Sequence, residues 1–220
     1  FLQSYHWARK AGFSNINVDL MFAIPGQTCE NWKHNLETIA ELSPEHISAY
    51  SLIIEEGTPF AQKKLILPSE DEEYQMYEDT AEILKKYGFH QYEISNYARD
   101  GFECRHNKGY WQRTEYLGAG LGAASLFQGK RFSNTRDMHT YLADSTEPEK
   151  IREDVTALSR NNEIEEFMFL GLRMTEGISE RQFERNFGCR IEDIYGSVLA
   201  KYKEMDLLEH TGEFWRFTRK

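Results

Sequence analysis

The stretch INVDLMFAIPGQT, from Ile16 to Thr28, decides the fold class of this chain. Its apolar run predicts a buried strand from about Ile16 to Ile24, which the turn-forming pair Pro25-Gly26 ends. Thr28 is a suitable N-cap for a following helix, because its side-chain oxygen can accept a hydrogen bond from a free backbone N–H. A strand that leads directly into a helix is the beginning of a βαβ unit.

The alternation of helix and strand continues on both sides of this stretch. Helical patterns cover residues 2–11, 29–43 and 69–86, and further strand patterns cover 46–54 and 90–97. Acidic residues open the third helix and lysines close it, as the helix dipole favours, and Gly88 follows as a C-cap. Such alternation predicts right-handed parallel βαβ units, so we expect part of an α/β barrel or a doubly wound sheet.

In either architecture the functional surface lies at the carboxyl ends of the strands. These ends carry Pro25–Thr28, Glu55–Thr58 and Asn96–Ala98. The last of them leads into CRHNKGYW, Cys104 to Trp111, which the sequence pattern predicts to be a loop. We therefore expect the functional residues in and around these segments.

The pattern changes at about Glu147, and we expect two domains, 1–146 and 147–220. Three amphipathic helical segments, 163–174, 179–188 and 191–209, precede the short strand EFWRF, which predicts a small winged-helix-like domain. Residues 151–220 hold 11 Lys or Arg against 14 Asp or Glu, and acidic residues open the third helix. This charge excludes DNA recognition by that helix.

Composition narrows the class of protein further. The 220 residues carry 26 Lys and Arg against 36 Asp and Glu, a formal charge of -10, so nucleic acids are not expected partners. Three scattered cysteines make neither a disulfide framework nor a zinc site, and no apolar run or leader predicts a membrane anchor, so we expect a cytoplasmic protein. The first residues already follow a helical pattern without an initiator Met, which indicates a fragment.

Two carboxylates stand inside the predicted strands. Asp19 lies in an apolar strand, where burial of an acid is costly unless a partner satisfies it. In a structural role it would cap a backbone group or pair with a Lys or Arg. In a functional role it would face a barrel lumen and accept hydrogen bonds from a ligand. Glu93 poses the same choice, nearer a strand end that water can reach.

The segment CRHNKGYW concentrates residues that could hold a planar ligand. His106 can ligate a metal or a heme iron, Cys104 offers a softer ligand, and Tyr110 and Trp111 can cover an apolar ring system. The alternative is a hydrogen-bonded structural histidine among packed aromatic residues. The glycine-rich stretch EYLGAGLGAASLFQG that follows, 115–129, indicates either close backbone approach to a ligand or tight packing.

Taken together, the motifs DLMFAIPGQT, ISAYSLIIEEGTPF, YEISNYARDGFECRHNKGYW and YLGAGLGAASL resemble one family. This family comprises the radical S-adenosylmethionine proteins related to oxygen-independent coproporphyrinogen III oxidase. Within the family, the motifs resemble the HemW heme-chaperone branch most. The mark of that branch is H-N-x-x-Y-W, here His106, Asn107, Tyr110 and Trp111. The resemblance extends over essentially the whole chain.

The resemblance implies an incomplete (β/α) barrel that holds a 4Fe–4S cluster and S-adenosylmethionine. The family's cluster motif C-x-x-x-C-x-x-C is absent from this sequence, so the chain alone is not expected to cleave S-adenosylmethionine. Ala23 departs from the family pattern, which usually has Gly at that place. By similarity, the contacts to S-adenosylmethionine are assigned to Asp19, Ala49, Gly120, Gly122 and Ala123.

By the same resemblance, the segment 104–111 holds heme. His106 is assigned as the ligand of the heme iron, Asn107 as the residue that orients it, and Tyr110 and Trp111 as an apolar wall. The heme would pass to a recipient apoprotein. Two alternatives stay open: an oxygen-independent coproporphyrinogen III oxidase, which decarboxylates two propionates, and a scaffold whose aromatic segment only packs domains together.

Overall fold

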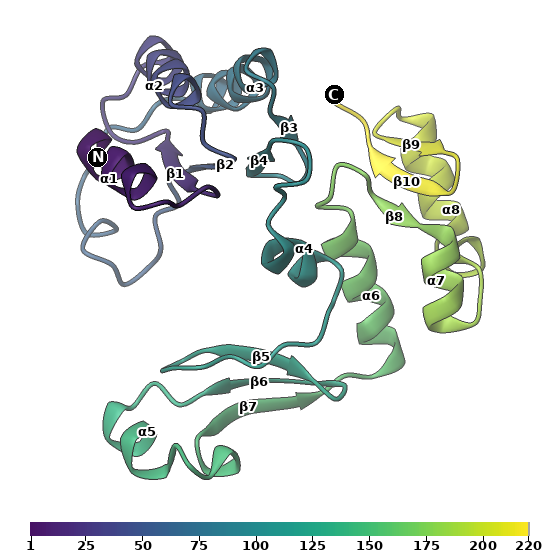
Figure 1. Cartoon of the computed structure of the whole chain (residues 1–220). Helices are drawn as coiled ribbons and strands as arrows, with labels where there is room; N and C mark the ends of the chain where they lie inside the picture. The colour runs from purple at the N-terminus through teal and green to yellow at the C-terminus, as the bar shows by residue number, and fades with distance from the viewer. Residues whose placement is uncertain (220) are drawn as a thin grey trace. The chain divides into compact units, whose positions relative to one another are not determined.

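The computed structural model describes residues 1–219. The chain forms two compact units (Figure 1). The first unit comprises residues 1–104, and the second begins at Arg105. The predicted domain boundary at 146/147 falls inside the second unit. That the helical domain begins at this boundary stays a prediction. None of the helices formed by residues 1–219 is long and apolar enough to cross a membrane.

The first unit contains the predicted βαβ arrangement. Strands β1 and β2 pair in parallel, with Phe22 opposite Ser51 at their carboxyl ends. Thr28 caps α2 and Ser69 caps α3, and both caps accept a hydrogen bond from the third helical residue, as predicted for Thr28. The bounds are α1 Leu2–Lys10, β1 Asn17–Phe22, α2 Cys29–Glu41, β2 His46–Ser51 and α3 Glu70–Lys86.

The predicted third parallel strand is wrong. Residues 90–98 form two short strands, β3 His90–Gln91 and β4 Asn96–Ala98, and β4 runs antiparallel to β2 and to β3. The reason is Glu93, whose carboxylate accepts hydrogen bonds from the Ser95 backbone (2.8 Å) and from Asn96 Nδ2 (2.5 Å). These bonds turn the chain back, and Glu93 is 1% exposed instead of open to water.

The two faces of this sheet differ in polarity. Val18 and Phe22 of β1 pack with the apolar residues of α2 and α3, whereas Asn17 and Asp19 point to the opposite face and are themselves exposed. Ala23, directly after β1, is buried and adopts φ +56°, a conformation that glycine favours. The family's usual Gly at this place therefore matches the backbone that the chain adopts.

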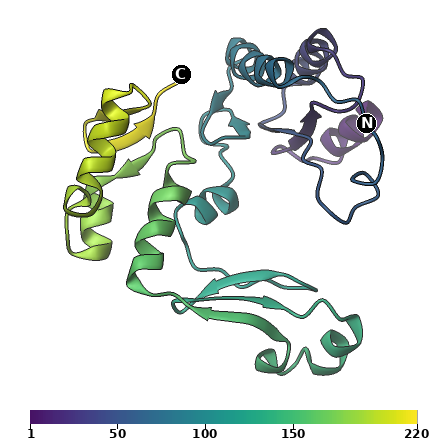
Figure 2. The same cartoon turned by 180° about the vertical axis from the view of Figure 1, so that it is seen from behind.

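The second unit begins with a helix where a loop was predicted. Residues Arg105–Trp111 form α4, and a three-stranded antiparallel sheet in the order β5-β6-β7 follows it. Figure 2 shows these strands side by side from behind, with α5 near one end. The bounds are β5 Ala124–Phe127, β6 Lys130–Asn134, α5 Met138–Asp144, a 3-10 turn Pro148–Lys150 and β7 Arg152–Ala157.

The rest of the second unit has the three helices and the hairpin that the sequence predicts. A small sheet in the order β8-β10-β9 packs with the helices around the fully buried ring of Phe183. Gly188 ends α7 in the left-handed conformation that a C-cap glycine adopts. The bounds are α6 Arg160–Gly171, β8 Ile178–Ser179, α7 Glu180–Phe187, α8 Ile191–Glu204, β9 Leu208–Thr211 and β10 Phe214–Phe217.

Candidate functional site

Helix α4 places an exposed histidine at the end of a row of aromatic rings. His106 and Tyr110 are four residues apart and therefore lie on one face of the helix, with ring centroids 4.5 Å apart at 71°. Tyr110 in turn contacts Tyr116 edge-on, with centroids 4.6 Å apart. The edge-to-face contacts fix the rings and leave the imidazole of His106 accessible to a ligand.

These rings line a cavity of about 620 Å³ in the second unit. This volume falls within the range of small-molecule sites, roughly 300–1,000 Å³. Three of the four predicted heme residues line it, whereas Asn107 is not among its lining residues. The remaining wall is mostly apolar or small, and the lining residues are His106, Tyr110, Trp111, Tyr116, Leu117, Gly118, Ala119, Ala123, Ala124, Arg131 and Leu170.

The glycine-rich segment forms one wall of this cavity by close backbone packing. A Cβ atom on Gly118 would lie 2.3 Å from the Ala124 carbonyl oxygen, so only glycine fits there. Asn134 fixes the segment, because its Nδ2 donates to the carbonyls of Gly118 (3.1 Å) and Gly120 (2.9 Å). At Gly118 the tight-packing interpretation is therefore correct.

The residues assigned to S-adenosylmethionine do not gather within one unit. Ala123 lines the cavity of the second unit beside the predicted heme residues, and Gly120 and Gly122 lie in the same segment with positive φ. Asp19 and Ala49 belong to the first unit. Their shared role as a ligand site stays a prediction.

Asp19 and Ala49 also lie on opposite faces of their sheet. Asp19 is exposed and accepts a hydrogen bond from Asn17 Nδ2 at 2.7 Å, so the expected buried acid is wrong. Its environment is polar because alternate residues of β1 face away from the helices. Ala49 is in the apolar core, and its backbone N–H donates to Ser95.

A buried histidine beside Asp19 was not found by sequence reasoning. His46 Nδ1 lies 2.6 Å from Asn17 Oδ1, and its Nε2 lies 2.8 Å from the hydroxyl of Tyr92. Burial lowers the pKa of His46. The negative charge of Asp19 has a smaller effect in the opposite direction. No sequence motif indicates this network, because Asn17 lies in β1, His46 in β2 and Tyr92 in the turn after β3.

A buried carboxylate links three elements around the cavity. Glu166 of α6 accepts from Arg131 Nε (2.5 Å) and Nη2 (3.1 Å) and from Arg113 Nε (3.0 Å). Burial alone would raise the pKa of Glu166, but the hydrogen bonds and charges of the two arginines outweigh it, and this pKa lies below its usual value. The cluster holds the guanidinium of Arg131 in place at the cavity wall.

We expect Glu166→Gln to lower the free energy of unfolding by about 2–3 kcal/mol at pH 7. The loss is smaller than the roughly 3–5 kcal/mol usual for a broken buried pair, because the Arg131 side chain is 34% exposed. Glutamine resembles a protonated Glu166, so the difference from the unsubstituted chain should vanish as pH falls through the lowered pKa. Urea unfolding at several pH values measures it.

Glu163→Gln is the matched control, because Glu163 is 37% exposed and contacts Arg113 only at 3.5 Å. We expect it to change the free energy of unfolding by less than about 0.5 kcal/mol. An equal loss in both variants, or a Glu166→Gln loss that does not depend on pH, would contradict the role given to the cluster.

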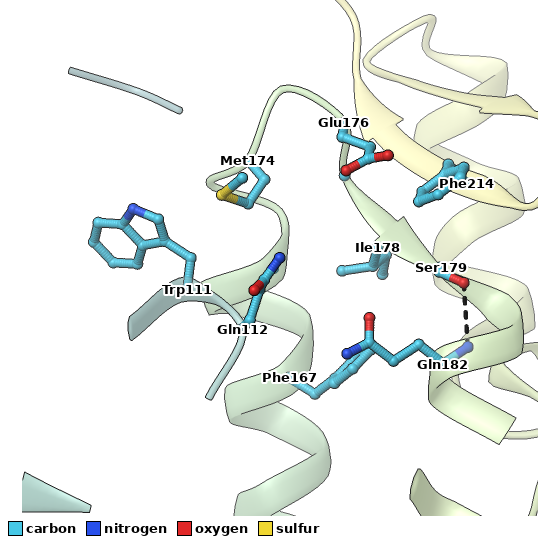
Figure 3. A pocket seen from close by; sticks show the side chains of 11 residues that line it. Trp111, Gln112, Phe167, Met174, Glu176, Ile178, Ser179, Gln182 and Phe214 are labelled. Carbon is cyan, nitrogen blue, oxygen red and sulfur yellow. Dashed lines mark hydrogen bonds between the residues drawn. The ribbon is translucent and has the colours of Figure 1, made fainter. Parts of the chain in front are cut away.

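Trp111 lines this cavity and also a smaller one of about 50 Å³, whose lining side chains Figure 3 shows. The guanidinium of Arg173 lies 4.4 Å from the centroid of the Trp111 ring, a cation–π contact. The indole Nε1 is buried and has no hydrogen-bond partner among residues 1–219. The smaller cavity suits a few water molecules and not a planar cofactor.

The described residues offer no site for an iron–sulfur cluster. Cys29, Cys104 and Cys189 are free, and no group of three or more His, Cys, Asp or Glu side chains in residues 1–219 could hold a metal ion. The donor set therefore does not fit a 4Fe–4S cluster, which needs three converging thiolates. Cys104, weighed as a soft ligand, does not line the cavity beside His106.

Comparisons with known proteins agree with the motifs. The HemN C-terminal domain family matches residues 158–220. The chain is 42% identical over 204 residues to "Heme chaperone HemW" of Lactococcus lactis, covering 91% of this chain and 53% of that protein. It is 39% identical to the protein of the same name from Bacillus subtilis, covering 94% and 56%.

A solved structure shows the same fold. The coproporphyrinogen III oxidase HemN of Escherichia coli, described as a radical SAM enzyme, superposes with a TM-score of 0.80 at 21% identity, covering 98% of this chain and 54% of that one. The predicted fold class, part of a radical SAM barrel followed by a small C-terminal domain, is confirmed. The chain spans about half the length of the curated relatives it matches.

Proposed function

The chain belongs to the family of HemN-like radical S-adenosylmethionine proteins, and from this premise we propose that it binds heme and delivers it to other proteins as part of a heme chaperone. The observation that carries the proposal is the cavity of about 620 Å³ with His106, Tyr110 and Trp111 of α4 in its wall. These are three of the four residues of the H-N-x-x-Y-W motif.

The chemistry of this wall suits a metalloporphyrin. A neutral imidazole is a common ligand of heme iron, and His106 is exposed at the cavity. Tyr110, Trp111 and Leu170 supply aromatic and aliphatic surface for the faces of the ring system. We assign the iron to His106 and the apolar wall to Tyr110 and Trp111, with Asn107 as a residue that acts from outside the cavity.

The oxidase alternative has less support. The relatives that are 42% and 39% identical carry the chaperone name, whereas the oxidase structure is 21% identical and supports the fold alone. The scaffold alternative predicts packed aromatic rings, yet His106 is exposed and three rings border open space. Heme as cargo accounts for both observations.

For the whole protein, the family implies S-adenosylmethionine and a 4Fe–4S cluster. Asp19, Ala49, Gly120, Gly122 and Ala123 are the proposed contacts of S-adenosylmethionine, and we derive no reaction step from them. The proposed partners are heme and a heme-accepting apoprotein, and the proposed location is the cytoplasm.

A heme titration followed by absorption in the Soret region tests the proposal. We expect saturable binding by the chain, and His106→Ala should weaken it by at least about tenfold, or 1.4 kcal/mol, with a changed Soret band because the iron loses its ligand. His139→Ala is the matched control, because His139 is exposed on α5 and does not line the cavity. Unchanged binding and spectrum in His106→Ala would contradict the assignment.

A further inference from the structure

The cavity wall carries one formal positive charge and no carboxylate. The chain has a formal charge of -10, yet its aspartates and glutamates are absent from the described residues that line this cavity. The positive charge belongs to Arg131 on β6, the central strand of the sheet β5-β6-β7. An apolar cavity with a single cation in its wall complements an apolar ligand that has an anionic edge.

The guanidinium of Arg131 is held in a fixed orientation. Glu166 accepts two hydrogen bonds from its Nε and Nη2, and Tyr116, itself in the cavity wall, also interacts with it. The two bonds to Glu166 occupy one edge of a planar group that has five N–H donors. The N–H donors that Glu166 and Tyr116 do not use can bind a second carboxylate, without the entropy cost of ordering a free side chain.

We propose that Arg131 binds a carboxylate at the edge of the planar ligand, which for heme is a propionate. The inference rests on the proposed function and adds to it the residue that recognises the anionic edge. His106 then holds the iron, the aromatic residues contact the ring faces, and Arg131 distinguishes a porphyrin with free carboxylates from one without them.

Arg131 also has a structural role, and the test must separate the two. Arg113 provides the comparison, because it donates to the same Glu166 but does not line the cavity. Loss of either arginine weakens the cluster, whereas only loss of Arg131 removes a cation from the cavity wall. Arg131→Lys supplies a second variant that retains the charge but not the two-bond geometry.

The experiment measures the affinities of the chain for heme and for heme dimethyl ester, in which both propionates are esterified. The unsubstituted chain, Arg131→Gln, Arg131→Lys and Arg113→Gln are titrated in the same detergent, at a temperature where circular dichroism shows all four folded. We expect the unsubstituted chain to prefer heme by about tenfold, the usual value of a charge-assisted hydrogen bond after desolvation.

In Arg131→Gln this preference should disappear, with affinity for the ester unchanged. Arg113→Gln should keep the full preference and Arg131→Lys most of it. An equal preference in Arg131→Gln and the unsubstituted chain, or an equal loss for both ligands, would overturn the assignment of Arg131 while leaving heme binding intact. Absence of saturable, His106-dependent heme binding by the unsubstituted chain would overturn the proposed function itself, and this assignment with it.

Discussion

Gly177→Ala is expected to lower the free energy of unfolding of the second unit by about 3–5 kcal/mol. Gly177 precedes β8 with φ +84°, which costs an alanine about 1–2 kcal/mol. Its added methyl group would also lie 2.1 Å from the Trp215 carbonyl oxygen and 2.6 Å from Arg216 Cβ. Because β8 pairs with β10 through Ile178 and Trp215, the methyl group must force the two strands apart.

Gly188→Ala separates the two contributions. Gly188 has φ +65° at the end of α7, but a Cβ there would meet no atom within 4 Å. We expect this variant to lose only about 1–2 kcal/mol, the cost of the left-handed backbone. Urea unfolding followed by circular dichroism measures both variants. Equal losses in the two variants would mean that the close approach to β10 is not the reason for glycine at position 177.

Trp32→Ala is expected to lower the free energy of unfolding of the first unit by about 3–5 kcal/mol, the usual cost of deleting a buried tryptophan. Trp32 of α2 is 1% exposed and packs on Phe22 of β1, with ring centroids 5.3 Å apart. Its indole N–H donates to the Met76 carbonyl (3.0 Å) and to Thr80 Oγ1 (2.9 Å) of α3. One side chain thus ties both helices to the sheet.

Trp7→Ala is the matched control, because Trp7 on α1 is 61% exposed. Its loss should change the free energy of unfolding by less than about 0.5 kcal/mol. Trp32→Phe should fall between the two, since it keeps most of the apolar volume but removes the indole donor, while Thr80 still donates to Met76. A small effect of Trp32→Ala would contradict its place at the centre of the core.

The elements that local signals specify were predicted well. Thr28 and the acidic start of α3 mark helix ends, and apolar runs mark β1 and β2. The C-terminal helices and the hairpin also follow from periodicity and turn residues. Each of these signals lies within a few residues of the element it predicts, so the sequence alone is sufficient to locate it.

The errors lie where distant or side-chain contacts determine the structure. The hairpin β3–β4 depends on the Glu93 carboxylate. The sheet β5–β7 was missed because its strands are short and β6 and β7 are mostly polar. Gly109 in the middle of 105–111 favours a loop, yet the segment is helical. At Glu93 the deciding contacts are side-chain hydrogen bonds to residues two and three positions away, which strand periodicity does not reveal.

The candidate site was predicted in part, for a similar reason. The composition of CRHNKGYW identified His106, Tyr110 and Trp111, which do line one cavity. Arg131 follows 20 residues after Trp111 and carries no motif, so only the antiparallel pairing of β5 and β6 places it in the same wall. Its charge was visible in the sequence, but its position was not.

The position of Trp111 gives the chain an optical reporter. Of its four tryptophans, Trp111 is the one in the wall of the cavity of about 620 Å³, while Trp7 is exposed and Trp32 and Trp215 are buried in apolar cores. An indole emits in the ultraviolet, where a neighbouring metalloporphyrin absorbs strongly. If heme binds in the cavity as proposed, it is therefore expected to quench the fluorescence of Trp111, and no attached dye is needed to follow its binding in time.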